Sequence, residues 1–155
     1  MSRDTPDRND GPRWLGTPEI NVVVFSLLFN LAWEFWQTPF FGGLAEGPHW
    51  KGVLLCTKAA FGDAFISLLA YWVVCVAART RQWVKRPTRV QVVIFVGAGL
   101  AVTLFLEILA TRVFDRWSYG EAMPVLPGLG VGLLPLAQWA LLPPVVLWVV
   151  RRQLG

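Results

Sequence analysis

The sequence predicts an all-α integral membrane protein: a four-helix transmembrane bundle with both termini in the cytoplasm. Three observations lead to this fold class. First, 55% of the 155 residues are hydrophobic and only 15% are charged, which is too apolar for a water-soluble domain of this size. Second, the apolar residues form four long runs, each close to the roughly 20 residues that a helix needs to span a bilayer. Third, the basic residues gather beside alternate ends of these runs.

A polar segment, residues 1–18, precedes the first apolar run and mixes Arg and Asp with Pro and Gly. This composition predicts a disordered cytoplasmic tail. The run that follows is too long for a signal peptide and lacks a clear small-residue cleavage site, so we expect it to stay in the protein as the first helix. The transmembrane domain is therefore predicted to cover residues 19–152.

The four runs set the order of the helices, once single polar residues are allowed inside each run. The predicted transmembrane helices cover residues 20–41, 53–78, 90–111 and 129–150. In the second helix, Gly62 is expected to let another helix approach closely. Cys56 and Cys75 both belong to this second helix, and they are too far apart along one rod to form a disulfide. We expect both to be free thiols that pack as small apolar residues.

The distribution of lysine and arginine predicts which side of the membrane each connection faces. The tail, the connection at 79–89 and the C-terminus carry most of these residues, whereas the other two connections hold only Lys51, Arg112 and Arg116. Basic residues concentrate on the cytoplasmic side of membrane proteins, so both termini are predicted to be cytoplasmic. The net charge of +4 comes from basic residues at the helix ends, where membrane orientation explains them. We therefore expect no nucleic-acid partner.

Three carboxylic acids interrupt the apolar runs at related depths. Glu34 and Glu107 lie near the outer ends of the first and third helices, and Asp63 lies in the outer half of the second. An acid that faces lipid costs about 2.5–3.5 kcal/mol near the centre of a helix, so the helices are expected to turn these groups toward one another. The sequence therefore predicts a carboxylate pocket near the outer, periplasmic side, with Glu34, Asp63 and Glu107 as catalytic residues.

Other polar and aromatic residues share the depth of these acids or lie in the loop that follows the third helix. The predicted substrate-binding residues are Asn30, Trp33, Gln37, Trp117, Tyr119 and Gln138. Aromatic rings, with Trp36 and Trp139 included, can stabilise a positive charge by cation–π contact. The loop at 112–130 is expected to form either an aromatic lid over the pocket or a simple interfacial belt.

Some of these polar residues have alternative interpretations. In the alternative interpretation, Asn30 and Gln138 have no binding role and only form hydrogen bonds that hold the helices together. Lys58, five residues before Asp63, either extends outward to the interface or pairs with Glu34 or with Glu107. The pattern leaves both alternatives open.

Metal and cofactor sites are not predicted. The single histidine, His49, is too few for a two-histidine zinc motif or a pair of haem ligands. The glycines at 128, 130 and 132 precede a membrane helix and follow no strand, so they do not form a dinucleotide-binding motif. We expect no metal and no cofactor.

Four segments carry a resemblance to known proteins: LAWEFWQTPFF, FGD, LFLEILATR and RWSYGEAMPVLPGLGVGLLPLAQW. Together they resemble a group of small bacterial four-helix membrane proteins, which implies this fold for residues 20–150 and a bacterial inner (cytoplasmic) membrane, but no activity. An acid followed by W-x-Y and a proline-rich turn is also similar to membrane-embedded carotenoid cyclases and hydratases, whose paired Glu-Glu is absent here. This likeness implies acid chemistry on isoprenoid double bonds without a metal.

Three functions compete at this point. The first is an enzyme whose carboxyl groups carry out acid–base chemistry on an isoprenoid or other lipid-like substrate, so that its partners are membrane lipid or a hydrophobic small molecule. The chain lacks the aspartate-rich DDxxD motif of prenyl-diphosphate chemistry. The second is a small ion- or proton-coupled transporter, for which four helices would require a homodimer. The third is an accessory subunit that docks into a larger membrane complex through its polar residues.

Overall fold

The computed structural model describes residues 16–42 and 47–155, and within these ranges its regular structure is helical. Its long helices are α1 (Pro18–Gln37), α2 (His49–Ala78), α3 (Arg89–Ile108) and α4 (Leu133–Leu154). All four are long and apolar enough to cross a membrane. The all-α class and the four helices are therefore confirmed. Residues 1–15 of the predicted disordered tail lie outside the described residues, so that part stays a prediction.

Local sequence signals explain where these helices begin and end. Pro18 stands in the first turn of α1, where its missing N–H is not needed. α3 begins with a capping box, in which Thr88 and Gln91 each bind the other's backbone N–H. α2 ends at Arg79, which adopts a left-handed conformation with φ of 54°.

Four helix ends differ by four residues from the predicted ranges, and two of these are the ends of α1 at Gln37 and of α4 at Leu154. α2 begins at His49 rather than at residue 53, directly after Pro48. α4 begins at Leu133 rather than at residue 129, because Gly128 and Gly130 have φ of 83° and 59°. Positive φ is incompatible with a right-handed helix, so residues 128–132 form a turn before α4.

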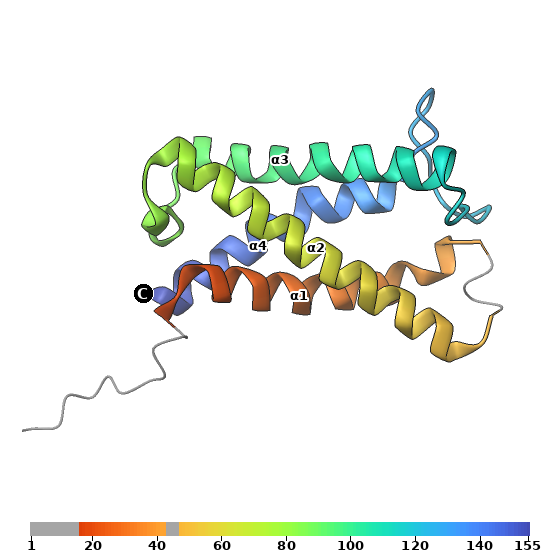
Figure 1. Cartoon of the computed structure of the whole chain (residues 1–155), viewed down its shortest axis with the longest axis horizontal. Coiled ribbons are helices and arrows are strands. Elements are labelled where there is room, and N and C mark those ends of the chain that lie inside the picture. The colour runs from red at the N-terminus through yellow and green to blue at the C-terminus, as the bar shows by residue number, and fades with distance from the viewer. Residues whose placement is uncertain (1–15, 43–46) are drawn as a thin grey trace, which may run out of the picture.

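The helices form a ring in which each one packs against its neighbours in the chain, and α4 closes the ring against α1. The beginning of α1, the C-terminus and the connection between α2 and α3 lie at one end of the bundle (Figure 1). From this end α2 and α3 diverge, so they are well separated at the opposite end (Figure 1). The two termini of the bundle therefore share a side, and that this side is cytoplasmic stays a prediction.

An apolar core fills the end of the bundle that holds the α2–α3 connection. Its buried residues are Val22, Ala70, Tyr71, Val74, Cys75, Trp83, Val84, Phe95, Val146, Leu147 and Val150. The short helix η3 (Arg81–Lys85) contributes Trp83 and Val84 to this core. Tyr71 donates a hydrogen bond of 2.6 Å to the carbonyl of Arg81, and the Arg81 guanidinium pairs with Glu19 of α1 at 2.5 Å. These contacts fix the helices together at this end.

The outward faces of the helices are strongly apolar. Val76 and Val93 are 77% and 69% exposed, and Phe61, Phe65 and Phe105 also face outward. Apolar exposure on this scale is unusual for a monomer in water and is expected where acyl chains cover the surface. Both cysteines are free and buried, as expected.

Candidate functional site

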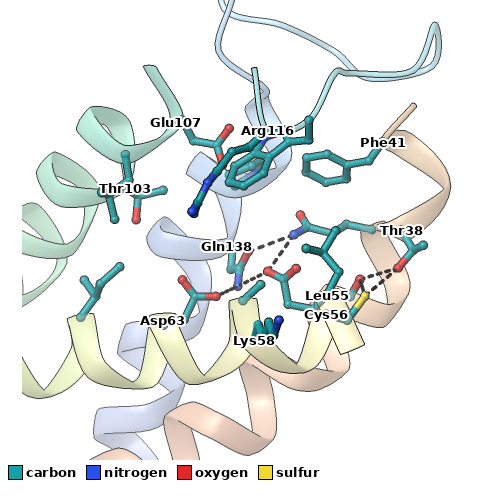
Figure 2. Close-up of a pocket in the computed structure, with 18 of the residues that line it drawn as sticks. Thr38, Phe41, Leu55, Cys56, Lys58, Asp63, Thr103, Glu107, Arg116 and Gln138 are labelled. Atoms are coloured by element: carbon teal, nitrogen blue, oxygen red, sulfur yellow. Dashed lines mark hydrogen bonds between the residues drawn. The ribbon is translucent and has the colours of Figure 1, made fainter. Parts of the chain in front are cut away.

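A cavity of about 320 Å³ lies inside the bundle, at the end where α2 and α3 diverge (Figure 2). All four long helices and the loop after α3 contribute to its wall. The lining residues are Glu34, Gln37, Thr38, Phe41, Leu55, Cys56, Lys58, Ala59, Gly62, Asp63, Ile66, Thr103, Leu106, Glu107, Arg116, Trp117, Pro135, Gln138 and Trp139. The structure thus brings the acids of α1, α2 and α3 to one cavity.

The side chain of Gln138 connects the polar groups of three helices. Its Nε2 lies 2.7 Å from Asn30 Oδ1, 2.9 Å from Asp63 Oδ2 and 3.3 Å from Glu34 Oε1 (Figure 2). Its Oε1 lies 3.5 Å from Gln37 Nε2, and only 2% of the residue is exposed. An amide nitrogen carries two hydrogens, so the three acceptors around Nε2 compete for two donors.

Glu34 and Asp63 face each other across this amide nitrogen. Each also has a second donor: Gln37 Nε2 lies 2.9 Å from Glu34 Oε1, and Trp139 Nε1 lies 3.4 Å from Asp63 Oδ1. Two carboxylates that share one donor repel each other when both are ionised. The arrangement therefore favours a pair that carries one proton and one negative charge, as in other carboxyl dyads.

Neither cation near the cavity forms an ion pair with Glu34 or Asp63. Lys58 and Arg116 both line the wall, but both side chains are exposed. Among the described residues the one ion pair is that of Arg81 with Glu19. The alternative in which Lys58 pairs with Glu34 or Glu107 is therefore wrong, and Lys58 instead lies at the exposed rim.

Glu107 is held by the loop that follows α3. The residue is 8% exposed, and Tyr119 donates its phenolic hydrogen to Glu107 Oε2. Burial, and then the hydrogen bond to Glu107, raise the pKa of Tyr119 above its ordinary value of 10.0. The phenol therefore stays protonated near neutral pH and acts as a donor toward Glu107. The Trp117 indole N–H is oriented toward Glu107 but does not reach hydrogen-bonding geometry, so its buried Nε1 forms no hydrogen bond.

Two backbone hydrogen bonds fasten this loop to the end of α1. Gly42 donates to the carbonyl of Ser118 and Gly120 donates to the carbonyl of Phe40, both at 2.9 Å. Phe41 pairs with Tyr119 as an isolated β-bridge, and their rings lie 5.8 Å apart. The loop thus places Arg116 and Trp117 in the cavity wall, and that it acts as a lid stays a prediction.

A π-helical turn, η4 (Leu109–Val113), follows the end of α3 directly and begins two residues after Glu107. Thr111 Oγ1 donates to the Glu107 carbonyl at 2.7 Å, and Arg116 N donates to the Ala110 carbonyl at 2.8 Å. The wider turn ends α3 and starts the loop that returns to the cavity. Single π turns occur frequently at functional sites, and the predicted continuous helix at 90–111 did not anticipate this one.

The predicted binding residues divide into two groups. Gln37, Trp117 and Gln138 line the cavity, whereas Asn30, Trp33 and Tyr119 lie behind the lining residues. Asn30 binds Gln138, and Trp33 Nε1 donates to Gln37 Oε1 at 3.0 Å. Trp139 is buried in the cavity wall, but Trp36 is 56% exposed. Trp36 points away because it lies two residues after Glu34, on another face of α1.

Several lining residues, among them Thr38 and Cys56, were not predicted in this role from the sequence. Thr38 Oγ1 donates to the Glu34 carbonyl at 2.9 Å and lies 3.2 Å from Cys56 Sγ. Cys56 was assigned to packing alone. Helical spacing was the available signal: Thr38 follows Glu34 by four residues, and Cys56 precedes Asp63 by seven, so each shares a face with an acid.

Replacing Tyr119 by phenylalanine is expected to weaken the contact between the loop and Glu107. Loss of the phenol leaves a buried carboxyl oxygen without its donor, which costs about 1–2 kcal/mol. The raised pKa of Tyr119 also predicts a pH effect. Stability that this phenol contributes is fully present below pH 10, its ordinary pKa, and is lost as pH rises above it.

Thermal unfolding of wild type and Tyr119→Phe across the alkaline range measures both effects. Ser118→Ala is the matched control, because its exposed side chain lies beside Tyr119 while its backbone still binds Gly42. The wild type should lose more stability above pH 10 than the phenylalanine variant, whereas the control should follow wild type. Equal alkaline losses in all three proteins would contradict the assigned contact.

Comparison with protein-family models, with curated proteins and with solved structures found no match for this chain.

Proposed function

We propose that this protein is a membrane-embedded enzyme that carries out acid–base chemistry on an isoprenoid or other lipid-like substrate. The observation that carries the proposal is the meeting of Glu34, Asp63 and Glu107 in one cavity. Hydrophobic side chains such as Leu55, Ile66 and Leu106 complete the wall. A mainly apolar cavity with a few convergent polar groups is the usual form of a small-molecule site.

The carboxyl groups supply both halves of a proton transfer. The protonated member of the Glu34–Asp63 pair donates its proton to a carbon–carbon double bond, and a carbocation forms at the neighbouring carbon. An ionised carboxylate of the cavity then removes a proton from an adjacent carbon, so that a new double bond forms and the proton count is restored. This isomerisation or cyclisation needs no oxidant, reductant or metal. The rings of Trp117 and Trp139 stabilise the cation by cation–π contact.

The two other hypotheses have less support from the geometry. Within the described residues, no three His, Cys, Asp or Glu side chains are placed to hold a metal ion together, so the acids by themselves form no cage for a hard cation. The polar residues Asn30, Gln37 and Gln138 are buried inside the bundle. They are therefore not available as an outer stripe for docking another subunit.

We propose a bacterial inner membrane as the location, with the cavity toward the outer side. The basic connection at 79–89, the start of α1 and the C-terminus lie at one end of the bundle (Figure 1), and the residues that line the cavity lie toward the other end. Positive segments on the cytoplasmic side would place the cavity near the outer leaflet.

Glu34→Gln tests the proposed chemistry. The amide keeps the size of the side chain but can no longer exchange a proton, and loss of a general acid or base lowers rates by about 10²- to 10⁴-fold. Lipid extracts are compared between cells that lack the gene and cells that carry wild type or Glu34→Gln. Both the deletion and the variant should accumulate the same lipid, and wild type should consume it.

The matched control is Glu121→Gln, an equal change of charge at an exposed loop position outside the cavity wall. This variant should restore the wild-type lipid profile. Identical profiles in all four strains would remove the proposal.

A further inference from the structure

The cavity opens sideways, between α2 and α3. The wall residues that are exposed belong to these helices and to the loop after α3: Leu55 is 37% exposed, Leu106 is 44% exposed, and Gly62 is also exposed. On the opposite side, Gln138 and Trp139 of α4 are both 2% exposed. α2 and α3 diverge toward the end of the bundle that holds the cavity (Figure 1). The opening between them faces the direction in which acyl chains would surround the bundle.

Gly62 makes a gap in the rim of this opening. The sequence analysis expected Gly62 to permit close helix packing, and that expectation is wrong, because no atom lies within 4 Å of a Cβ placed there. Its chain neighbour Phe61 and the nearby Phe65 are 59% and 61% exposed. An apolar surface with a missing side chain thus leads from the outside of α2 to the cavity.

Two buried hydrogen-bond donors of the cavity wall have no partner. Thr103 is 7% exposed and lines the wall, and its Oγ1 binds no other group. Trp117 Nε1, on the loop after α3, is likewise buried and forms no hydrogen bond. Buried polar groups are nearly always hydrogen-bonded, so these two donors indicate a missing acceptor. Figure 2 shows Thr103 on α3 beside Glu107, facing the cavity that Asp63 borders from α2.

The charges of the wall decide what kind of acceptor this is. A phosphate or carboxylate headgroup would lie near Glu34, Asp63 and Glu107, and repulsion between like charges is strong where water is excluded. A neutral oxygen accepts the same hydrogen bonds without that repulsion. Lys58 and Arg116 also line the cavity, but both side chains are exposed and neither forms an ion pair with an acid of the wall.

We propose that the cavity binds a neutral lipid that carries an oxygen acceptor, such as a hydroxyl, carbonyl or ether group. The lipid reaches the cavity from the hydrocarbon phase between α2 and α3, past Gly62, and its oxygen accepts hydrogen bonds from Thr103 Oγ1 and Trp117 Nε1. This assignment rests on the proposed function, whose substrate class it narrows, but it concerns binding and not the reaction.

Photolabelling in vesicles of phosphatidylethanolamine and phosphatidylglycerol tests this binding directly. The probes are hexadecanol and hexadecane, each with a diazirine at mid-chain, at equal bilayer concentration. Wild type should incorporate more of the alcohol than of the hydrocarbon in peptides of the cavity wall. Thr103→Val keeps the shape but removes one donor, and should reduce this preference by about two- to tenfold.

Gly62→Phe tests the route independently of the donors. A Cβ at this position meets no atom within 4 Å, so the fold should be retained, while the ring obstructs the opening and labelling by the alcohol in the wall falls. Gly97→Phe is the matched control: Gly97 is an exposed glycine of α3 with no atom within 4 Å of its Cβ position, and it lies outside the wall. It should label like wild type.

The binding proposal is overturned if hexadecane labels the wall as well as hexadecanol does, or if Gly62→Phe labels like wild type. Its failure can be distinguished from failure of the proposed function, because Glu34→Gln changes the chemistry and leaves both donors and the gap intact. Labelling that follows the expected pattern supports binding even when Glu34→Gln cells have normal lipids. Altered lipids without selective labelling support the chemistry and refute this binding mode.

Discussion

Gly99→Ala is expected to destabilise the bundle and displace Trp139, although it adds only one methyl group. A Cβ at this position would overlap the Cε3 and Cζ3 atoms of the Trp139 ring. Trp139 is buried in the cavity wall, so a displaced ring must either strain its packing against α3 or move into the cavity. Overpacking of this kind costs about 1–3 kcal/mol. Because Trp139 Nε1 donates to Asp63, a shifted ring also disturbs the Glu34–Asp63 pair.

Thermal unfolding of the purified protein in detergent measures this effect. Gly97→Ala is the matched control, since no atom lies within 4 Å of its Cβ position on the same helix, and alanine favours a helix over glycine. The control should therefore be as stable as wild type or slightly more stable. If the two variants melt at the same temperature, α3 and α4 do not pack as described.

Gln138→Leu is expected to have a comparable effect through the loss of hydrogen bonds. Leucine is similar in size but removes the donor that Asn30 and Asp63 share. Each buried polar group that is left without a partner costs about 1–3 kcal/mol. The change also leaves the Glu34–Asp63 pair without the amide that separates its charges, so turnover should fall together with stability.

The comparison variant is Gln153→Leu, the same substitution at an exposed position in the last turn of α4. Unfolding temperature and the lipid profile of complemented cells are measured for both. We expect Gln153→Leu to match wild type in both measurements. A Gln138→Leu protein with wild-type stability would show that Gln138 does not connect the helices.

The sequence predicts the structure best where a single large free-energy cost leaves few alternative arrangements. Long apolar runs leave few alternatives to membrane-spanning helices, and the cost of exposing Glu34, Asp63 and Glu107 to lipid points all three inward. The same reasoning could not decide between pocket and glue for Gln138. The structure shows that it lines the cavity and connects the helices at the same time.

Other features depend on distances that no sequence pattern contains. Gly62 and Gly99 both interrupt apolar helices, but only Gly99 lies against a neighbouring ring, and Gly62 faces open space. Trp33 and Trp36 are close to Glu34 in sequence, yet neither lines the cavity. The π turn after Glu107 depends on which backbone carbonyl accepts each N–H. That choice depends on the path of the loop that returns to Phe41.

If molecules enter through the sideways opening between α2 and α3, the concentration that controls binding is the one in the membrane and not the one in the whole sample. A molecule that arrives through the hydrocarbon is encountered in two dimensions, and its effective amount is its mole fraction among the surrounding lipids. Adding empty vesicles or detergent should therefore dilute such a compound and slow its turnover, even when the total quantity in the sample is unchanged.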